Sequence, residues 1–280
     1  MFETLRQSLK TGVVTTSYPQ TPPEVSTHAR GKPEIDWANW KDARPAAAIC
    51  PTAAIARADN AGVRTATLDL GKCIFCGLCA EVDTAIRMTD VCELAARRSG
   101  DLKFAGRYQL NSDGTHGKMV NSPIAGPMDR KSCEATGREL HARIHKVLGR
   151  SLHIREVDAG SCNGCEVEIV GLNSPVYDIE RFGIHFVASP RNADMLLVTG
   201  PVTRNMELAL RKTYDATPDP RLVVAVGACG CSGGIFGQNY ASLGGVDTVV
   251  PVDAYIPGCP PNPHALLHGI LLAIGRLAGP

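Results

Sequence analysis

Four cysteines in the C-terminal half have the residue type and spacing of an iron–sulfur site. Cys162 and Cys165 form a C-x-x-C pair, and Cys229 and Cys259 follow later in the chain. Thiolates are the usual protein ligands of iron–sulfur clusters, and a four-iron cluster takes four of them. Glycines beside these cysteines let the backbone approach a bulky group, and Pro260-Pro261 stiffens the chain after Cys259. The pattern predicts a single four-thiolate site.

Three other chemistries are open for these cysteines. A thioredoxin-like redox pair explains the C-x-x-C unit and leaves Cys229 and Cys259 idle. A zinc site could combine that unit with Cys229 and Cys231, but Cys259 then has no role. A nucleotide site at residues 227–234 lacks the G-x-G-x-x-G spacing. The iron–sulfur interpretation accounts for more of the cysteines, and we assign Cys231 to a place beside the site.

A second cysteine set lies in the N-terminal part. Cys73, Cys76 and Cys79 form C-x-x-C-x-x-C, and Cys50 stands upstream before a proline. In two-cluster bacterial ferredoxins, the last cysteine of each C-x₂-C-x₂-C-x₃-C-P run serves the other cluster. Applied here, that rule makes these four cysteines the ligands of one 4Fe–4S cluster. A zinc site made of the same cysteines is the alternative, although three cysteines at two-residue gaps suit a cluster better.

The same rule indicates that a second cluster has been lost from this repeat. The four positions where its cysteines would stand carry other residues, which are Trp40, Ala43, Ala46 and Asp83. All four ligands of one cluster are absent while all four of the other remain. We therefore predict a one-cluster domain descended from a two-cluster repeat.

Composition excludes several function classes. The 280 residues are 44% hydrophobic, 5% aromatic and 20% charged, with a formal net charge of +1. Neither base-stacking aromatics nor a basic surface for nucleic acid is indicated. There are eleven cysteines and no export signal, which favours metal or cluster ligation over disulfides. The longest apolar run, 265–278, is shorter than the roughly 20 residues that span a bilayer, so we expect any membrane link to go through a partner.

The elements that must position the C-terminal cysteines alternate between strand and helix. Short apolar strands are expected at 152–157, 184–187, 194–198, 222–226 and 248–252, with helices within 166–182 and at 205–215 and 262–277. Such alternation predicts an α/β fold with a flavodoxin-like parallel sheet covered on both faces. Each cysteine follows a strand, so the set should converge at the carboxyl edge of the sheet.

The sequence divides into four expected parts. Residues 1–45 are an extended N-terminal arm that begins with a short helix, and 46–105 are an α+β ferredoxin-like 4Fe–4S domain with one cluster lost. Residues 106–150 are a turn-rich linker and a helix at 132–148, and 151–280 are the parallel-sheet domain. Cys92 and Cys133 show no partner pattern and are expected to be free thiols. His141 and His145 lie one turn apart on the linker helix and lack metal-binding companions.

Several motifs resemble those of a known family. The segments C-N-G-C-E-V-E at 162–168, T-G-P-V-T-R at 199–204 and Y-I-P-G-C-P-P at 255–261 resemble the proximal-cluster small subunit shared by membrane-bound nickel–iron hydrogenases and respiratory complex I. The formate hydrogenlyase type is the most similar, because complex I subunits carry adjacent cysteines where this chain separates Cys162 from Cys165. Residues 1–105 resemble the ferredoxin-like subunit of the same complexes, so the chain resembles a fusion of two subunits.

This resemblance implies a function. The protein would relay electrons through two 4Fe–4S clusters to or from an active site in a hydrogenase-type large subunit, and would hold no catalytic residue itself. Glu166 is a possible proton relay, or else a carboxylate placed at a helix N-terminus. Implied partners are an iron–sulfur subunit or formate dehydrogenase and membrane-arm subunits, on the cytoplasmic side of the membrane. A complex I-like quinone oxidoreductase subunit and a zinc-stabilised assembly module are the alternatives.

Overall fold

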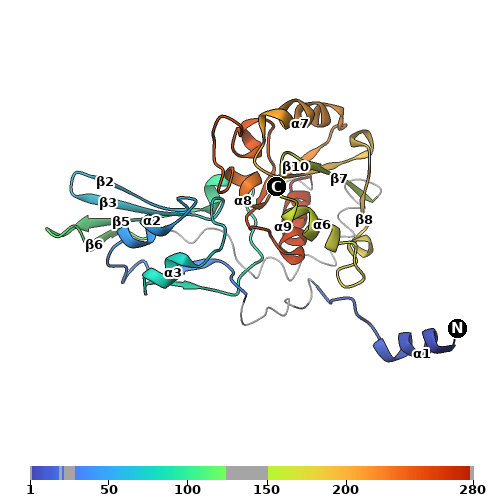
Figure 1. Cartoon of the computed structure of the whole chain (residues 1–280), viewed down its shortest axis with the longest axis horizontal. Helices are drawn as coiled ribbons and strands as arrows, with labels where there is room; N and C mark the ends of the chain where they lie inside the picture. Colours follow the sequence, from blue (N-terminus) through green and yellow to red (C-terminus); the bar gives the residue numbers. More distant parts are fainter. Residues whose placement is uncertain (1, 19–20, 22–28, 124–150, 278–280) are drawn as a thin grey trace.

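The computed structural model describes residues 2–18, 21, 29–123 and 151–277. They form two lobes that lie side by side, with the N-terminal helix α1 (Phe2–Thr11) projecting away from both (Figure 1). No side chain of α1 is buried. The expected linker helix at 132–148, with Cys133, His141 and His145, lies outside the described residues.

The C-terminal lobe is built on five parallel strands. They are β7 (Leu152–Asp158), β8 (Ile184–Phe186), β9 (Met195–Thr199), β10 (Leu222–Val226) and β11 (Ala254–Ile256). Their spatial order is β8-β7-β9-β10-β11. Numbered from the start of the lobe this is 2-1-3-4-5, the order of flavodoxin, in which ligands bind where the order reverses between the first and third strands. The predicted parallel sheet is confirmed.

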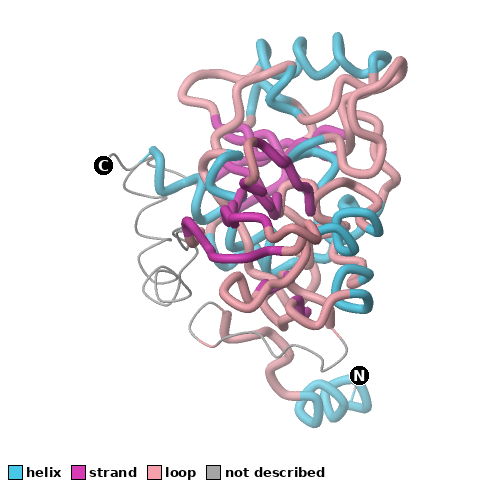
Figure 2. Tube along the Cα trace, turned by 90° about the vertical axis from the view of Figure 1, so that its left-hand side faces the viewer, coloured by secondary structure: helices cyan, strands magenta, loops and turns pink. Residues whose placement is uncertain are grey.

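Helices cover both faces of this sheet. Strand residues alternate between two apolar cores: Leu197 packs with α9 (Pro263–Leu277), while Leu196 packs with Leu210 of α7 (Arg204–Ala216). The helix α6 (Gly164–Gly171) contacts α9 on the first face, and α8 (Gly227–Ser232) contacts β9, β10 and β11. The strands pass between these helical layers (Figure 2). Full burial of both faces explains why the strand sequences are continuously apolar.

One expected strand of this lobe was wrong in position, and one expected helix is present but shorter than the segment expected to contain it. The strand expected at 248–252 is absent; residues Val246–Thr248 form a 3₁₀ helix, and the strand comes later, at Ala254–Ile256. Val249 and Val250 are buried by packing rather than by strand pairing, and Pro251 has no N–H for a ladder. The helix expected within 166–182 is confined to α6, and a 3₁₀ helix forms at Ile179–Phe182.

The N-terminal lobe repeats a strand–helix–strand unit. Its elements are β1 (Pro33–Ile35), α2 (Arg44–Ile49), β2 (Ile55–Asn60), β3 (Val63–Asp69), α3 (Leu78–Val82) and β4 (Ile86–Met88). The outer strands β1 and β4 pair antiparallel, and so do the inner strands β2 and β3. The two helices contact each other. The first of these four strands pairs with the last, and the second pairs with the third. Two copies of one unit related by a two-fold axis would give this pattern.

Two boundaries of this lobe differ from expectation. Strand β1 lies inside the segment expected to be an arm. The connector expected from residue 106 instead contains β5 (Lys103–Leu110) and β6 (His116–Asn121), which extend the inner sheet to the order β2-β3-β5-β6. The turn at 111–114 is present, but it closes a hairpin. The strands of this lobe therefore extend from residue 33 to residue 121.

The two lobes share one contact surface. Ala96 bridges to Tyr255 in antiparallel fashion, and the Ser232 hydroxyl donates to the Gly71 carbonyl at 2.9 Å. One apolar core contains residues of both lobes, among them Leu70 and Leu102 of the first and Val223 and Tyr255 of the second.

Among the helices of the described chain, none combines the length and apolar character needed to cross a bilayer.

Candidate iron–sulfur sites

The four C-terminal cysteines lie at one edge of the parallel sheet. Cys162 and Cys165 follow β7, Cys229 lies in α8 directly after β10, and Cys259 follows β11. The other three cysteines all act electrostatically on the Cys165 thiol, so the set is close in space. Folds with this strand order bind their ligands outside the carboxyl ends of the strands, which is the edge where these cysteines lie. The strand order therefore brings the loops that carry these cysteines to one edge, and a single four-thiolate site stays a prediction.

Local hydrogen bonds set the loop that carries Cys162. The carboxylate of Asp158, at the end of β7, accepts from the N–H groups of Gly160 and Ser161, both at 2.7 Å. Gly200, after β9, packs so tightly here that an added Cβ would lie 2.6 Å from the Ser161 nitrogen. A second tie joins the other two loops, because the Ala228 N–H donates to the Gly258 carbonyl at 2.6 Å. Backbone contacts thus join the loop after β7 to the loop after β9, and the start of α8 to the loop after β11.

Glycines leave room around the sulfurs. A Cβ on Gly227 would lie 2.8 Å from the Cys165 Sγ, and one on Gly234 would lie 2.8 Å from the Cys229 Sγ. Both glycines have positive φ, +79° and +55°. Any other residue would crowd the thiols and strain the backbone. Glycine at these two positions therefore lets the backbone pass close to the two sulfurs.

Burial favours the protonated form of three of these thiols, those of Cys165, Cys229 and Cys259. It raises the pKa of Cys165 to about 12, with Glu166 and the other cysteines adding to the effect, and the pKa of Cys229 to about 11. The pKa of Cys259 is also raised, first by burial and then by Cys162. A thioredoxin-like nucleophile needs a lowered pKa, so this environment opposes that alternative. Bound metal displaces such protons, and its charge is what would stabilise the thiolates.

The N-terminal cysteines form the second set. Cys50 is the C-cap of α2, Cys79 lies in α3, and the loop that joins β3 to α3 carries Cys73 and Cys76. All four line one cavity with apolar neighbours that include Ile55 and Leu68. Burial raises the pKa of Cys73 to about 12, and the other three cysteines add to the shift. The Phe75 N–H donates to the Cys73 Sγ at 3.4 Å, the kind of contact that stabilises a cluster ligand.

Packed side chains occupy the four positions where the cysteines of a second cluster would stand. Trp40 is 2% exposed, Ala43 and Ala46 are fully buried, and all three belong to one apolar core. The Trp40 Nε1 donates to the Asp83 carboxylate at 2.6 Å. Two of the four positions are therefore bonded directly to each other. An indole and its hydrogen bond stand where the repeat would place a second ligand set.

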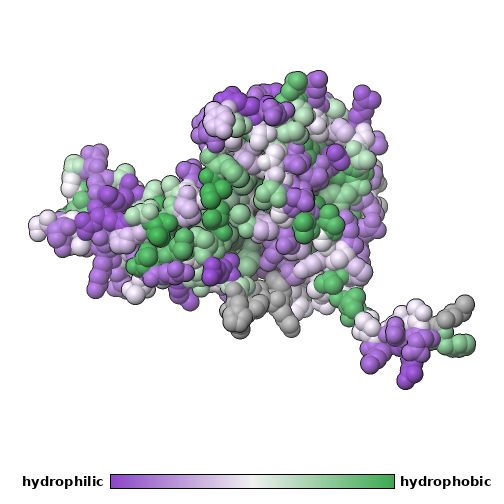
Figure 3. Space-filling model, in the orientation of Figure 1, coloured by the Kyte–Doolittle hydropathy of each residue, from purple (hydrophilic) through white to green (hydrophobic). Residues whose placement is uncertain are grey.

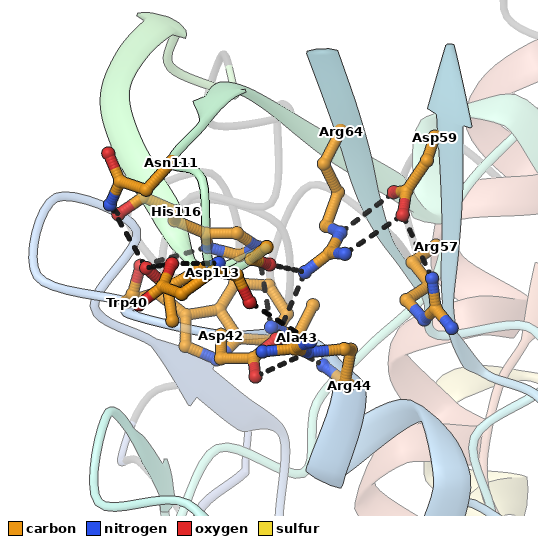
Figure 4. A network of polar contacts seen from close by, with 12 residues as sticks. Trp40, Asp42, Ala43, Arg44, Arg57, Asp59, Arg64, Asn111, Asp113 and His116 are labelled. Carbon is orange, nitrogen blue, oxygen red and sulfur yellow. Dashed lines mark hydrogen bonds and ion pairs between the residues drawn. The ribbon is translucent and has the colours of Figure 1, made fainter. Parts of the chain in front are cut away.

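The hairpin β5–β6 covers this closed position (Figure 4). Tyr108 of β5 and His116 of β6 stack with ring centroids 4.0 Å apart, and both meet Trp40 edge-on. The His116 Nδ1 lies 2.9 Å from the Trp40 carbonyl oxygen. Beside them the buried Arg64 donates to Asp59, Asp42 and the Gly114 carbonyl. Residues outside the strand–helix–strand repeat thus complete its core.

A pair of carboxylates lies beside the C-terminal set. The Thr199 hydroxyl, at the end of β9, donates to Glu166 Oε1. The other Glu166 oxygen and Oε1 of Glu156 are buried without a hydrogen-bond partner among the described residues. Burial raises the pKa of Glu156, and repulsion from Glu166 adds to it. The sequence singled out Glu166 but not Thr199 or Glu156. These two residues lie within strands β9 and β7, and the strand pattern does not distinguish them from core residues.

The remaining described cysteines lie outside both sets. Cys231 is buried, and its Sγ faces the Ala225 carbonyl at 3.8 Å, so it packs α8 against β10. Cys92 is half-buried and lines a cavity between the lobes. Within the described ranges, no three cysteine, histidine or carboxylate side chains meet as the ligands of a single metal ion do.

Comparison with known proteins gives the family. The model of the NADH ubiquinone oxidoreductase 20 Kd subunit family matches residues 162–273. The chain is 47% identical over 137 residues to the probable membrane-bound hydrogenase subunit mbhJ of Pyrococcus furiosus. The aligned region covers 49% of this chain and 82% of that protein. The chain belongs to this family.

Two further similarities were found. The chain is 51% identical over 162 residues to formate hydrogenlyase subunit 7 of Escherichia coli K12, covering 56% of this chain and 64% of that protein. A chain of the archaeal membrane-bound sulfane sulfur reductase complex matches at 39% identity with a TM-score of 0.41, over 46% of this chain and 71% of that one. Members of this family are iron–sulfur-binding oxidoreductase subunits, and so is this chain.

Proposed function

We propose that the protein is an electron-transfer subunit of a membrane-associated hydrogenase of the formate hydrogenlyase type. Cys162, Cys165, Cys229 and Cys259 hold one 4Fe–4S cluster, and Cys50, Cys73, Cys76 and Cys79 hold the other. The clusters supply one-electron transfer. The observation that carries the proposal is that one packed chain holds two separate sets of four cysteines, and that within each set the cysteines raise one another's pKa. The names of the relatives at 47% and 51% identity support the hydrogenase assignment.

The domain organisation we propose follows the two lobes. Residues 33–121 are a ferredoxin-like domain that keeps one cluster site, and 151–280 are the proximal-cluster domain. The two-fold pairing of β1 with β4 and β2 with β3 supports the first assignment. The Trp40–Asp83 hydrogen bond supports the loss of the second ligand set. The protein then combines in one chain what related complexes carry on two.

A hydrogenase-type large subunit is the partner proposed for the C-terminal site. Cys162 and Cys259 are exposed there. Large apolar side chains are exposed on the adjacent elements, and these are Val167, Val170, Ile235 and Phe236. Apolar side chains (green) also gather near the junction of the lobes, whereas the far tip of the N-terminal lobe is largely hydrophilic (Figure 3). The large subunit would cover the exposed thiols and hold the active site.

Further partners complete the proposed complex. An iron–sulfur subunit or formate dehydrogenase exchanges electrons at the N-terminal site. Membrane-arm subunits hold the complex at the cytoplasmic side of the membrane. The residues of this chain bind and orient the two clusters, exclude water from Cys73 and Cys165, and provide no nucleophile–base pair of their own within the described residues.

Iron and sulfide analysis of anaerobically purified protein tests the proposal. Two four-iron clusters give about eight irons and about eight sulfides per chain. Zinc without sulfide would instead establish an assembly module. A complex I-like quinone oxidoreductase subunit is the second candidate, favoured by the description of the matching family. Nickel in the co-purified large subunit distinguishes the hydrogenase from that candidate.

Glu166→Gln tests the proposed proton relay. The Thr199 hydroxyl can still donate to the amide oxygen, so both clusters should assemble as in the wild type. Because an amide cannot carry a proton, we expect turnover of the complex to fall by about tenfold or more. Glu168→Gln, on the same helix, is the matched control. Equal turnover in the two variants would exclude Glu166 as a relay.

A further inference from the structure

A cavity separates the loops that carry the two cysteine sets. From the N-terminal lobe it is lined by Arg30, Phe75 and Cys92, and from the C-terminal lobe by Gly258, Pro260 and Pro261. Phe75 lies between Cys73 and Cys76, and Gly258 and Pro260 flank Cys259. The cavity is therefore bordered by ligand loops on both sides. The residues on its wall are the ones that can act on both sites.

Arg30 holds the ligand loop of the N-terminal set. Its Nη1 donates to the Cys76 carbonyl at 2.6 Å. The same side chain lies over Gly77, where an added Cβ would be 3.5 Å from Arg30 Cδ and 3.6 Å from Nε. Gly77 has a φ of +84°, so the loop turns sharply at this point. The guanidinium thus contacts the chain directly between Cys76 and Cys79.

The backbone beside Arg30 is anchored to a neighbouring segment. The Gly31 N–H donates to the Thr89 carbonyl at 2.7 Å, and the Lys32 N–H donates to the Val91 carbonyl at 2.8 Å. An added Cβ on Gly31 would lie 2.4 Å from the Val91 carbonyl oxygen, so only glycine allows this approach. The base of the Arg30 side chain is therefore held at the cavity wall.

The charge of Arg30 is constant and is not neutralised nearby. Arginine remains protonated throughout the physiological pH range. Within the described part of the chain, no carboxylate forms an ion pair with it, and its hydrogen bond goes to a neutral carbonyl. The cavity wall around it is largely apolar, with Phe75, Val91 and Leu94. The guanidinium itself is exposed, so solvent screens its charge and its effect should be confined to the loop that it contacts.

We propose that Arg30 is a positioning residue that fixes the Cys76 loop and raises the reduction potential of the N-terminal cluster relative to the C-terminal one. Reduction adds negative charge to a cluster, and a nearby cation stabilises the reduced form. Because Arg30 contacts the Cys76–Cys79 loop directly, its effect should be larger on that site. This inference rests on the proposed function, since it requires both clusters to be present.

Redox titration of the full chain, followed by electron paramagnetic resonance, tests the proposal. Arg30→Gln removes the charge and keeps a hydrogen-bond donor of similar reach. We expect the potential of the N-terminal cluster to fall, with a smaller fall at the C-terminal cluster. The matched control is Arg87→Gln, which removes a 76% exposed arginine of the same lobe that pairs with Glu34. That control should leave both potentials near those of the wild type.

The outcomes separate this inference from the proposed function. Absence of either cluster from the wild-type chain would refute the function itself. If both clusters are present and their potentials are the same in Arg30→Gln as in Arg87→Gln, only the role of Arg30 is refuted. Arg30→Lys keeps the charge, so it should retain a potential near that of the wild type. An equal fall in Arg30→Lys and Arg30→Gln would show that the charge is not the cause.

Discussion

The double substitution C162A/C165A is expected to halve the iron content of the protein. Removing two of four ligands leaves the C-terminal site unable to hold a cluster, while the N-terminal set is untouched. Iron should fall from about eight to about four per chain. The mirror variant C73A/C76A should lose the same amount from the other site. In the reduced wild type the two paramagnetic clusters should interact, and each double variant should show one isolated spectrum.

Matched controls decide how this result is interpreted. Cys92→Ala removes a half-buried thiol that belongs to neither set and should leave iron near eight. Cys231→Ala tests the buried thiol of α8 in the same way. Loss of all iron in one double variant would mean that the sites assemble as a unit. Unchanged iron in either double variant would contradict the ligand assignment.

Trp40→Ala is expected to destabilise the N-terminal lobe strongly. The indole is nearly fully buried, meets the rings of Tyr108 and His116, and donates to Asp83. Truncation of a buried tryptophan costs about 3–5 kcal/mol, and it also removes the hydrogen bond. For a domain of this size each kcal/mol lowers the melting temperature by about 4–8 °C. The temperature at which the N-terminal cluster loses its visible absorbance should therefore fall by more than about 10 °C.

Two comparison variants separate packing from hydrogen bonding at this position. Trp40→Phe keeps most of the ring but removes the donor, so its effect should be intermediate. Asp83→Asn keeps an acceptor for the Trp40 N–H, and a small change is expected. C162A/C165A provides a background in which only the N-terminal cluster absorbs. A melting profile of Trp40→Ala that matches the wild type would mean that the indole does not stabilise this lobe.

The sequence predicted the architecture where one physical rule dominates. Fully buried parallel strands must be apolar throughout, so β9 and β10 were recognisable, and strand order then brought Cys229 and Cys259 toward Cys162. The spacing rule for cysteines identified Trp40 and Asp83 as replacements, and the hydrogen bond between them agrees with that interpretation.

Other features were missed because their sequence signals are shared by different structures. The turn residues at 111–114 are the same in a linker and in a hairpin, and only the alternation of Phe104, Gly106 and Tyr108 pointed to β5. The valines at 248–252 have strand propensity, yet they are buried by packing. Arg30 lies in the segment 30–34, which resembles the ferredoxin-like subunit, but that resemblance does not reveal its contact with a residue 46 positions away.

The bond from Ser232 to Gly71 and the bridge from Ala96 to Tyr255 have a consequence for assembly. Two separate redox subunits must meet by diffusion, and cells must balance their supply. Here both cysteine sets are made in one translation event and are held together by a common core. If the proposed function holds, the two clusters would be present one to one, and an electron would pass between them without an encounter of subunits.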